Sequence, residues 1–179
     1  NELDYFFIKN SFKKIFVITG KNSYFRSTAD KIFNKYLNEK NSFFYFKKNF
    51  VPEFNELKKI ILKIKKIKPD LILAIGGGTV IDYAKMSSCI QIENLSRKSI
   101  KNFNLKLKKN IILCAIPTTA GSGAEVTANA VIYVDNFKYS VENHFIKPDF
   151  FFLIPELSLK SSFKIKSSSG FDVISQAIE

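Results

Sequence analysis

Three consecutive glycines, Gly76–Gly78, lie between the apolar run Leu71–Ile75 and a predicted helix over Ile81–Ile90. Without side chains, this stretch can turn sharply and bring bare backbone N–H groups close to an anion. The positive N-terminal end of the following helix favours the same anion. The run therefore predicts a pyrophosphate cradle. Because it matches neither G-x-G-x-x-G nor a P-loop, a tight turn that binds nothing remains the alternative.

A second polar loop, Pro117–Thr127, follows the apolar run Ile111–Ile116. It is rich in glycine and small hydroxyl residues, including Thr118 and Thr119. In an open parallel sheet, ligands bind beyond the carboxyl ends of the strands. Two such loops after successive strands should meet at one crevice, which favours ligand binding over two ordinary connections.

Alternating strand and helix patterns must position these loops. Their order predicts an α/β fold with an open, mostly parallel sheet and helices on both faces. Asp135-Asn136 is a turn signal for a hairpin. The predicted strands are 14–19, 42–46, 71–75, 111–116 and 149–154; the helices are 27–37, 53–67, 81–90 and one from Gly170; 96–109 is a surface connection, and 131–134 pairs with 138–141.

Composition limits the class of protein. The 179 residues are 46% hydrophobic and 25% charged, which is typical of a globular domain. No apolar run approaches ~18 residues, so we expect no membrane span. The net charge of +12 comes from scattered lysines, and no basic patch interleaved with aromatics favours nucleic acid. Cys89 and Cys114 do not have the spacing of metal-binding cysteines. We expect both to be reduced thiols in the core of a cytoplasmic protein.

Three motifs in order carry a resemblance to a known family. Gly76–Lys85 resembles G-G-G-S-x-x-D-x-A-K, and Pro117–Thr127 resembles P-T-T-A-G-T-G-S-E-V-T with Ser122 and Ala124 as departures. Gly170–Glu179 resembles G-[MF]-D-A-L-T-H-A-I-E. Together they resemble the iron-containing (group III) alcohol dehydrogenases. Pro155-Glu156-Leu157 is similar to the family's D-P-E-L, although Ile154 stands where Asp is usual.

The resemblance implies a dinucleotide-binding α/β domain over residues 1–160 and the start of a helical metal-binding domain over 161–179. It implies that Gly77, Gly78 and Thr79 contact the pyrophosphate and that Asp82 lies beside the cofactor. The expected cofactor-binding residues are Gly20, Gly76, Gly77, Gly78, Thr79, Asp82, Thr118, Thr119, Thr127 and Lys138.

Gly20 bears on cofactor choice. In NAD-dependent members of the family, an Asp that closes the first strand accepts a hydrogen bond from the ribose 2′-hydroxyl. Here Gly20 ends that strand and Lys21 follows. A carboxylate would repel a 2′-phosphate, whereas glycine leaves room and lysine offers charge. We therefore predict NADP(H) over NAD(H), with binding of both as the alternative.

The same resemblance implies a divalent metal, Fe²⁺ or Zn²⁺, held by an Asp, a His one helical turn later and two further histidines. Asp172 fits the first position, but position 176 is Gln. A Gln oxygen is a weaker ligand for such cations. Either this chain belongs to a branch that uses Asp172 and Gln176, which we favour, or the metal site has degenerated. His144, the only histidine, is expected to lie in a loop without a ligand role.

The expected function is a metal-assisted oxidoreductase that interconverts an alcohol and an aldehyde or ketone with NAD(P)H. Lys138–Glu142 and Gln176 resemble relatives that reduce phosphonoacetaldehyde, so a small anionic aldehyde is the expected substrate. The expected partners are this small molecule and a second copy in a homodimer, and we expect this fragment alone to be inactive. The alternatives are a non-catalytic or vestigial nucleotide-binding module, or a glycerol dehydrogenase-like or 3-dehydroquinate synthase-like enzyme.

Overall fold

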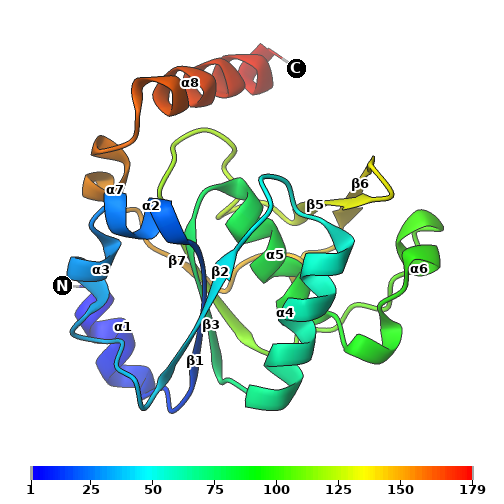
Figure 1. Cartoon of the computed structure of the whole chain (residues 1–179), viewed down its shortest axis with the longest axis horizontal. Helices are drawn as coiled ribbons and strands as arrows, with labels where there is room; N and C mark the ends of the chain where they lie inside the picture. Colours follow the sequence, from blue (N-terminus) through cyan, green and yellow to red (C-terminus); the bar gives the residue numbers. More distant parts are fainter. Residues whose placement is uncertain (1, 179) are drawn as a thin grey trace.

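A five-stranded, all-parallel sheet forms the centre of the molecule (Figure 1). The computed structural model describes residues 2–178, except for the side chain of Gln176. The strand order is β2-β1-β3-β4-β7. The strands are β1 (Ile15–Gly20), β2 (Ser42–Lys47), β3 (Leu71–Gly76), β4 (Ile112–Pro117) and β7 (Phe150–Phe151). The predicted α/β architecture is confirmed.

Helices cover both faces of the sheet (Figure 1). Neighbouring strand residues point to opposite faces. Phe16 and Ile18 accordingly join the core under the helices Phe54–Ile67 and Gly78–Cys89, whereas Ile15 and Val17 join the core under the helices Glu2–Asn10 and Ala29–Phe33. Because both faces are buried, the central strands are continuous apolar runs. The helices are α1 (Glu2–Asn10), α2 (Lys21–Arg26), α3 (Ala29–Phe33), α4 (Phe54–Ile67), α5 (Gly78–Cys89), α6 (Arg97–Lys101), α7 (Pro155–Leu159) and α8 (Phe163–Ile178), with 3-10 turns at Ile92–Asn94 and His144–Ile146.

Helix α4 shows why the sequence pattern succeeds. Phe54, Leu57, Ile60 and Ile64 recur at helical spacing and are all buried against the sheet. The helix ends where Lys68 adopts a left-handed φ of 53° and Pro69 follows. Strand β3 then begins at Leu71, as predicted.

The predicted hairpin is also present, formed by β5 (Asn129–Val134) and β6 (Phe137–Glu142). Its two turn residues, Asp135 and Asn136, have φ values of 51° and 67°. Two left-handed residues match the twist of a two-residue hairpin, and Asp and Asn tolerate that conformation.

Two predicted stretches in the first and middle parts of the chain were wrong. The helix expected over 27–37 is shorter, since only Ala29–Phe33 is helical in α3, and Thr28, with a φ of 64°, separates α3 from α2. The connection over 96–109 contains α6, whose start is capped by reciprocal hydrogen bonds between Ser96 and Ser99. Helix α1 was not predicted.

Two boundaries near the end of the chain also differ. The strand expected over 149–154 reduces to Phe150–Phe151 in β7, and Pro155 then opens α7. Helix α8 begins at Phe163 and not at Gly170, which lies within it. Glycine costs about 1 kcal/mol inside a helix, which the rest of this 16-residue segment tolerates.

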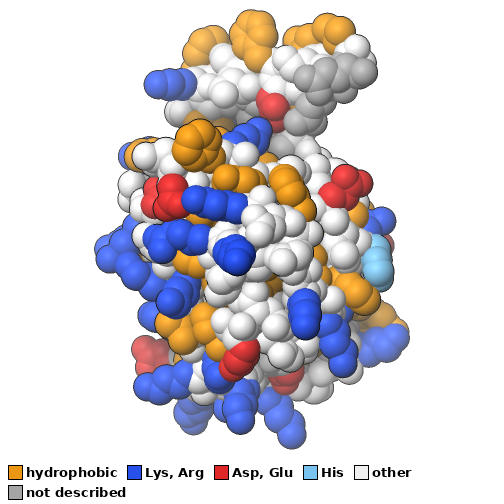
Figure 2. All heavy atoms as spheres, turned by 90° about the vertical axis from the view of Figure 1, so that its right-hand side faces the viewer, with side chains coloured by type: hydrophobic (Ala, Val, Ile, Leu, Met, Phe, Trp, Pro, Cys, Tyr) orange, Lys and Arg blue, Asp and Glu red, His pale blue; other side chains and the backbone are white. Residues whose placement is uncertain are grey.

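Helix α8 stands apart from the sheet at one end of the molecule (Figure 1). Figure 2 shows apolar side chains along its outer side, and Phe163, Phe171, Ile174 and Ile178 are exposed. The division between residues 160 and 161 stays a prediction. Across residues 2–178, no helix combines the length and apolar character that crossing a membrane requires.

Candidate functional site

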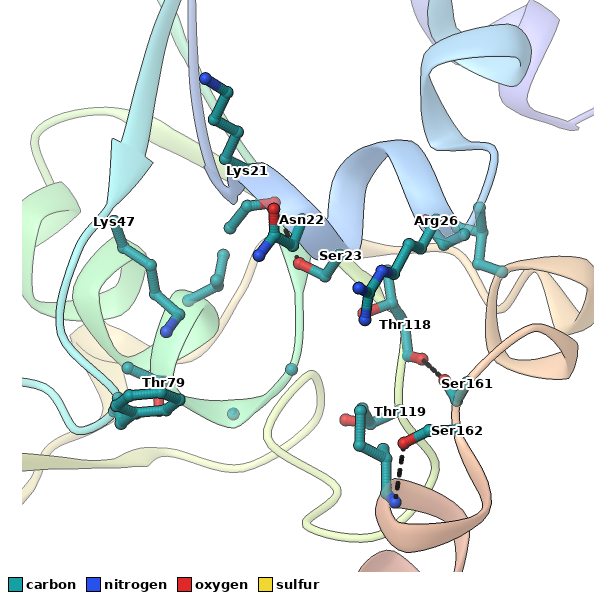
Figure 3. Close-up of a pocket in the computed structure, with 18 of the residues that line it drawn as sticks. Lys21, Asn22, Ser23, Arg26, Lys47, Thr79, Thr118, Thr119, Ser161 and Ser162 are labelled. Carbon is teal, nitrogen blue, oxygen red and sulfur yellow. Dashed lines mark hydrogen bonds between the residues drawn. The ribbon is translucent and has the colours of Figure 1, made fainter.

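A cleft of about 930 Å³ lies at the carboxyl ends of β1, β3 and β4 (Figure 3). It is the place where parallel α/β sheets bind ligands. The glycine run contributes Gly77 and Gly78, and the second polar loop contributes Thr118 and Thr119. The two loops predicted to converge therefore do meet at one cleft, together with Gly20 from the end of β1.

The glycine run fits tightly because it has no side chains. A Cβ on Gly76 would lie 2.6 Å from Val80 Cγ2, and one on Gly77 would lie 3.0 Å from Thr119 Oγ1. Gly77 is the N-cap of α5, so the free N–H groups of the first helical turn face the same end of the sheet. This arrangement can bind an anionic group without any charged side chain.

The threonines hold the two loops together. Thr118 is buried, its amide donates to the Gly76 carbonyl at 3.1 Å, and its own carbonyl accepts from Ser161 Oγ at 3.5 Å (Figure 3). The hydroxyl of Thr79 donates to the Phe50 carbonyl at 2.8 Å, so this side chain fixes a neighbouring loop. The backbone of Thr79, and not its hydroxyl, is thus available for an anion.

The lining of the cleft is strongly basic. Every charged residue among its described lining residues is a cation: Lys21, Arg26, Lys47, Lys48 and Lys160. Figure 3 shows Lys47 and Arg26 pointing into the cleft, whereas Lys21 extends away from Thr79 and Thr118. Lys21, the lysine that the sequence suggested for this site, thus borders the cleft, and the sequence reasoning missed Lys47 and Arg26, which point into it.

Lys47 is placed by strand register. It pairs with Gly20 in the parallel ladder of β1 and β2, so both lie at the carboxyl edge. A Cβ on Gly20 would lie 3.9 Å from Lys47 Cε and 2.7 Å from Ser23 Oγ, and Ser23 Oγ donates to the Gly20 carbonyl at 3.0 Å. Burial lowers the pKa of Lys47, opposed by the charge of Glu56.

Four of the predicted cofactor residues, Gly76, Asp82, Thr127 and Lys138, lie outside the lining of this cleft. Asp82, on α5, is half-buried, and burial raises its pKa to about 6, opposed by Lys85, a backbone hydrogen bond from Val131 and Lys138. Lys138 lies exposed on β6. The hydroxyl of Thr127 accepts a hydrogen bond from Lys85 at 2.9 Å.

The predicted metal ligands lie on α8. Gly121, in the second polar loop, packs against this helix, with a built Cβ 3.5 Å from Asp172 Oδ2. The side chain of Gln176 lies outside the described residues. Over residues 2–178, no group of three His, Cys, Asp or Glu side chains is placed to hold a metal.

Cys89 and Cys114 are separate buried thiols, as expected.

The sheet and its basic cleft define an α/β domain with a cleft at the carboxyl ends of its parallel strands, where such folds bind ligands. Residues 1–155 match the model of one family, described as iron-containing alcohol dehydrogenase. The chain belongs to this family of oxidoreductases, as the three motifs predicted.

Individual relatives agree with this assignment. An alcohol dehydrogenase of Thermococcus barophilus is 34% identical over 137 residues, which cover 72% of this chain and 36% of that protein. An NADPH-dependent butanol dehydrogenase of Clostridium saccharobutylicum is 34% identical over 121 residues, covering 65% of this chain and 31% of that protein. The chain thus spans about a third of the length of these relatives.

The fold matches solved structures at greater coverage. A sulfoacetaldehyde reductase of Bifidobacterium kashiwanohense, solved in complex with NAD⁺, superposes with a TM-score of 0.88 at 24% identity. The match covers 99% of this chain and 48% of that structure. At this identity the likeness establishes the fold.

Proposed function

We propose that this chain is the dinucleotide-binding part of an oxidoreductase that interconverts an alcohol and an aldehyde or ketone. The observation that carries the proposal is the cradle formed by Gly77, Gly78 and the start of α5, which opens into a cleft lined by cations. A pyrophosphate suits such a cradle because backbone N–H groups and the helix dipole both favour negative charge. When bound, the nicotinamide would supply or accept the hydride.

We further propose that the cofactor is NADP(H). Gly20 puts no carboxylate at the end of β1, and Lys47 and Arg26 point into the same cleft. A 2′-phosphate would find positive charge there and no like-charged neighbour from β1. The similarity to an NADPH-dependent butanol dehydrogenase supports this choice.

The metal is a separate part of the proposal. Asp172 would supply one carboxylate ligand, beside the loop of Gly121. The described residues do not complete a site, since Asp172 has no cluster of His, Cys, Asp or Glu around it that could hold a cation. We therefore assign no chemical step to a metal here. A second candidate function is nucleotide binding without catalysis, which the basic cleft and its glycine cradle would support by themselves.

The substrate class follows from charge. A small anionic aldehyde such as phosphonoacetaldehyde would be drawn to the basic lining, which includes Lys160 at the start of the connection to α8. The proposed setting is the cytoplasm, and the proposed assembly is a homodimer.

Titration calorimetry with NADP⁺ and NAD⁺ tests the proposal directly. We expect both nucleotides to bind and NADP⁺ to bind more tightly. Absence of binding by both would refute the dinucleotide site, and tighter binding of NAD⁺ would refute only the cofactor choice. An assay of aldehyde reduction with NADPH then separates the two candidate functions: turnover supports the oxidoreductase, and binding without turnover supports the non-catalytic module.

A further inference from the structure

Glu56, on α4, is a buried carboxylate that is fully engaged in hydrogen bonds. Only 4% of its surface is exposed. Its Oε1 accepts from the Lys48 amide at 2.7 Å and the Tyr45 hydroxyl at 3.3 Å, and its Oε2 accepts from the Asn49 amide at 3.1 Å and the Tyr83 hydroxyl at 3.0 Å. Burial of a carboxylate is costly without such partners, so this network is a strongly defined feature.

The network fixes one short segment, Lys47–Phe50, which begins at the last residue of β2. Glu56 binds two consecutive amides of this segment. Thr79, at the start of α5, binds the carbonyl of Phe50 at 2.8 Å. Within the segment, Lys47 Nζ donates to the Asn49 carbonyl at 2.7 Å. The path of the segment, and with it the direction of the Lys47 side chain, therefore depends on contacts from α4 and α5.

Tyr83 extends this support to the residues that follow. Its hydroxyl accepts from the Glu53 amide at 2.7 Å and lies 3.3 Å from the Val51 carbonyl. Burial, together with the charge of Glu56, raises the pKa of Tyr83 and raises that of Tyr45 to about 12. Both phenols thus keep their protons and act as donors to the Glu56 carboxylate.

The segment borders the cleft at the position that bears on cofactor choice. Lys47, Lys48 and Phe50 all line the cleft. Lys47 is the register partner of Gly20, and the absent side chain of Gly20 leaves space beside it. Figure 3 shows the Lys47 ammonium pointing into the cleft towards Thr79.

We propose that Glu56 is a positioning residue for cofactor selection. By holding the segment Lys47–Phe50, it keeps the Lys47 ammonium beside the space left by Gly20, where Lys47 binds the 2′-phosphate of NADP(H). This inference rests on the proposed dinucleotide-binding function and adds the residue that sets its selectivity. Lys47 contacts the ligand, and Glu56 acts through the backbone that carries it.

The substitution Glu56→Gln distinguishes the positioning role from a purely electrostatic one, because the two roles predict opposite changes in the affinity for the 2′-phosphate. Replacing Glu56 with Gln removes a negative charge near an anion site, which by itself would strengthen phosphate binding. Gln also offers one acceptor oxygen where the carboxylate has two, so at least one loop amide or phenol loses its acceptor. Positioning therefore predicts weaker binding of the 2′-phosphate, against the electrostatic trend.

The test measures the dissociation constants of NADP⁺ and NAD⁺ for the wild-type chain and its variants by titration calorimetry. Lys47→Met should lower the NADP⁺ to NAD⁺ preference about tenfold, the usual effect of losing a hydrogen bond to a charged group. Glu56→Gln should lower it several-fold in the same direction. Tyr83→Phe, which leaves Glu56 in place but removes one donor, should give a smaller decrease.

Asp70→Asn is the matched control. Asp70 accepts from the amides of Lys13 and Lys14 at 2.8 and 2.9 Å, so it is also a carboxylate that holds two consecutive amides. It immediately precedes β3, at the amino ends of the strands, whereas the cleft lies at their carboxyl ends. Its substitution should lower thermal stability without changing the cofactor preference.

The outcomes separate the two levels of the proposal. If the wild-type chain binds neither nucleotide, the proposed function fails and the role of Glu56 fails with it. If the wild-type chain prefers NADP⁺ and Glu56→Gln keeps that preference, or strengthens NADP⁺ binding, only the positioning role is overturned. If Glu56→Gln weakens both nucleotides equally, Glu56 is structural and the inference is again overturned.

Discussion

The ammonium group of Lys85 and the hydroxyl of Thr127 form a hydrogen bond of 2.9 Å between α5 and the loop that leads into β5. Lys85 also donates to the Asn129 carbonyl at 2.8 Å and has no exposed surface. Burial lowers its pKa to about 8, opposed by the charges of Asp82 and Glu125. The motif residues Lys85 and Thr127 are thus joined to each other, and their contact anchors the β5–β6 hairpin to α5.

This contact predicts a large loss of stability on substitution of Lys85 by Met. The change would leave Thr127 and the Asn129 carbonyl without their buried donor, and Asp82 without the nearby positive charge of Lys85. Losing one partner of a buried charged network costs about 3–5 kcal/mol. Urea denaturation should show this loss, while Lys59→Met, on the exposed side of α4, should change stability by less than about 0.5 kcal/mol. Equal stability of the two variants would contradict the anchoring role.

The pKa of Asp82 predicts a pH dependence. Burial raises this pKa from 3.8 to about 6, so between these values the folded chain binds a proton that the unfolded chain has released. Its contribution to stability is therefore full below about pH 4 and is lost as the pH rises through 6. Asp82→Asn removes this contribution. Unfolding curves should show the wild type losing stability relative to Asp82→Asn from pH 4 to 6; a constant difference would argue against a raised pKa.

The tight fit of the glycine run predicts that a single methyl group affects nucleotide binding. In Gly77→Ala, the new Cβ would lie 3.0 Å from Thr119 Oγ1, so the Thr119 side chain in the second polar loop must give way. NADP⁺ binding should weaken by about 1 kcal/mol or more, roughly fivefold. Gly170→Ala is the control, because a Cβ there meets nothing within 4 Å. It should leave binding unchanged and stabilise α8 slightly. Similar affinities for both variants would remove Gly77 from the site.

Gly20→Asp should reverse the cofactor preference. The new carboxylate would face a 2′-phosphate and compete for Lys47, whose Cε lies 3.9 Å from the built Cβ. Two unit charges about 4 Å apart interact by ~1–4 kcal/mol between water and a protein surface, so we expect at least a tenfold shift towards NAD⁺. Gly20→Ala separates the charge from the crowding of Ser23. A shift of the same size in Gly20→Ala would show that charge is not the cause.

The sequence predicted the fold well because burial leaves a periodic pattern. The runs that form β1, β3 and β4 are apolar throughout, as strands covered on both faces must be. The errors occurred where single residues override the pattern. Thr28 adopts a left-handed conformation inside a helical stretch, and Gly170 lies in the middle of α8 although glycine usually marks a boundary.

The candidate site was predictable only in part, for a related reason. Gly76–Gly78 and Thr118-Thr119 are visible in the sequence, because glycine and small hydroxyl residues after a strand indicate a ligand loop. Lys47 and Glu56 carry no such signal, because their roles depend on the register of β2 against β1 and on a loop that folds over α4. Lys21 follows Gly20 directly and borders the cleft, but its side chain extends away from Thr79 and Thr118.

The exposed apolar side of α8 also bears on the solubility of the chain at different salt concentrations. Phe163, Phe171 and Ile178 form part of a water-facing apolar row on a molecule that carries a net charge of +12. At low ionic strength, mutual repulsion keeps such molecules apart. At about 0.15 M salt, repulsion reaches only about 8 Å, and contact between apolar rows becomes favourable. Solutions of the chain should therefore stay clear in dilute buffer and become turbid as salt is added.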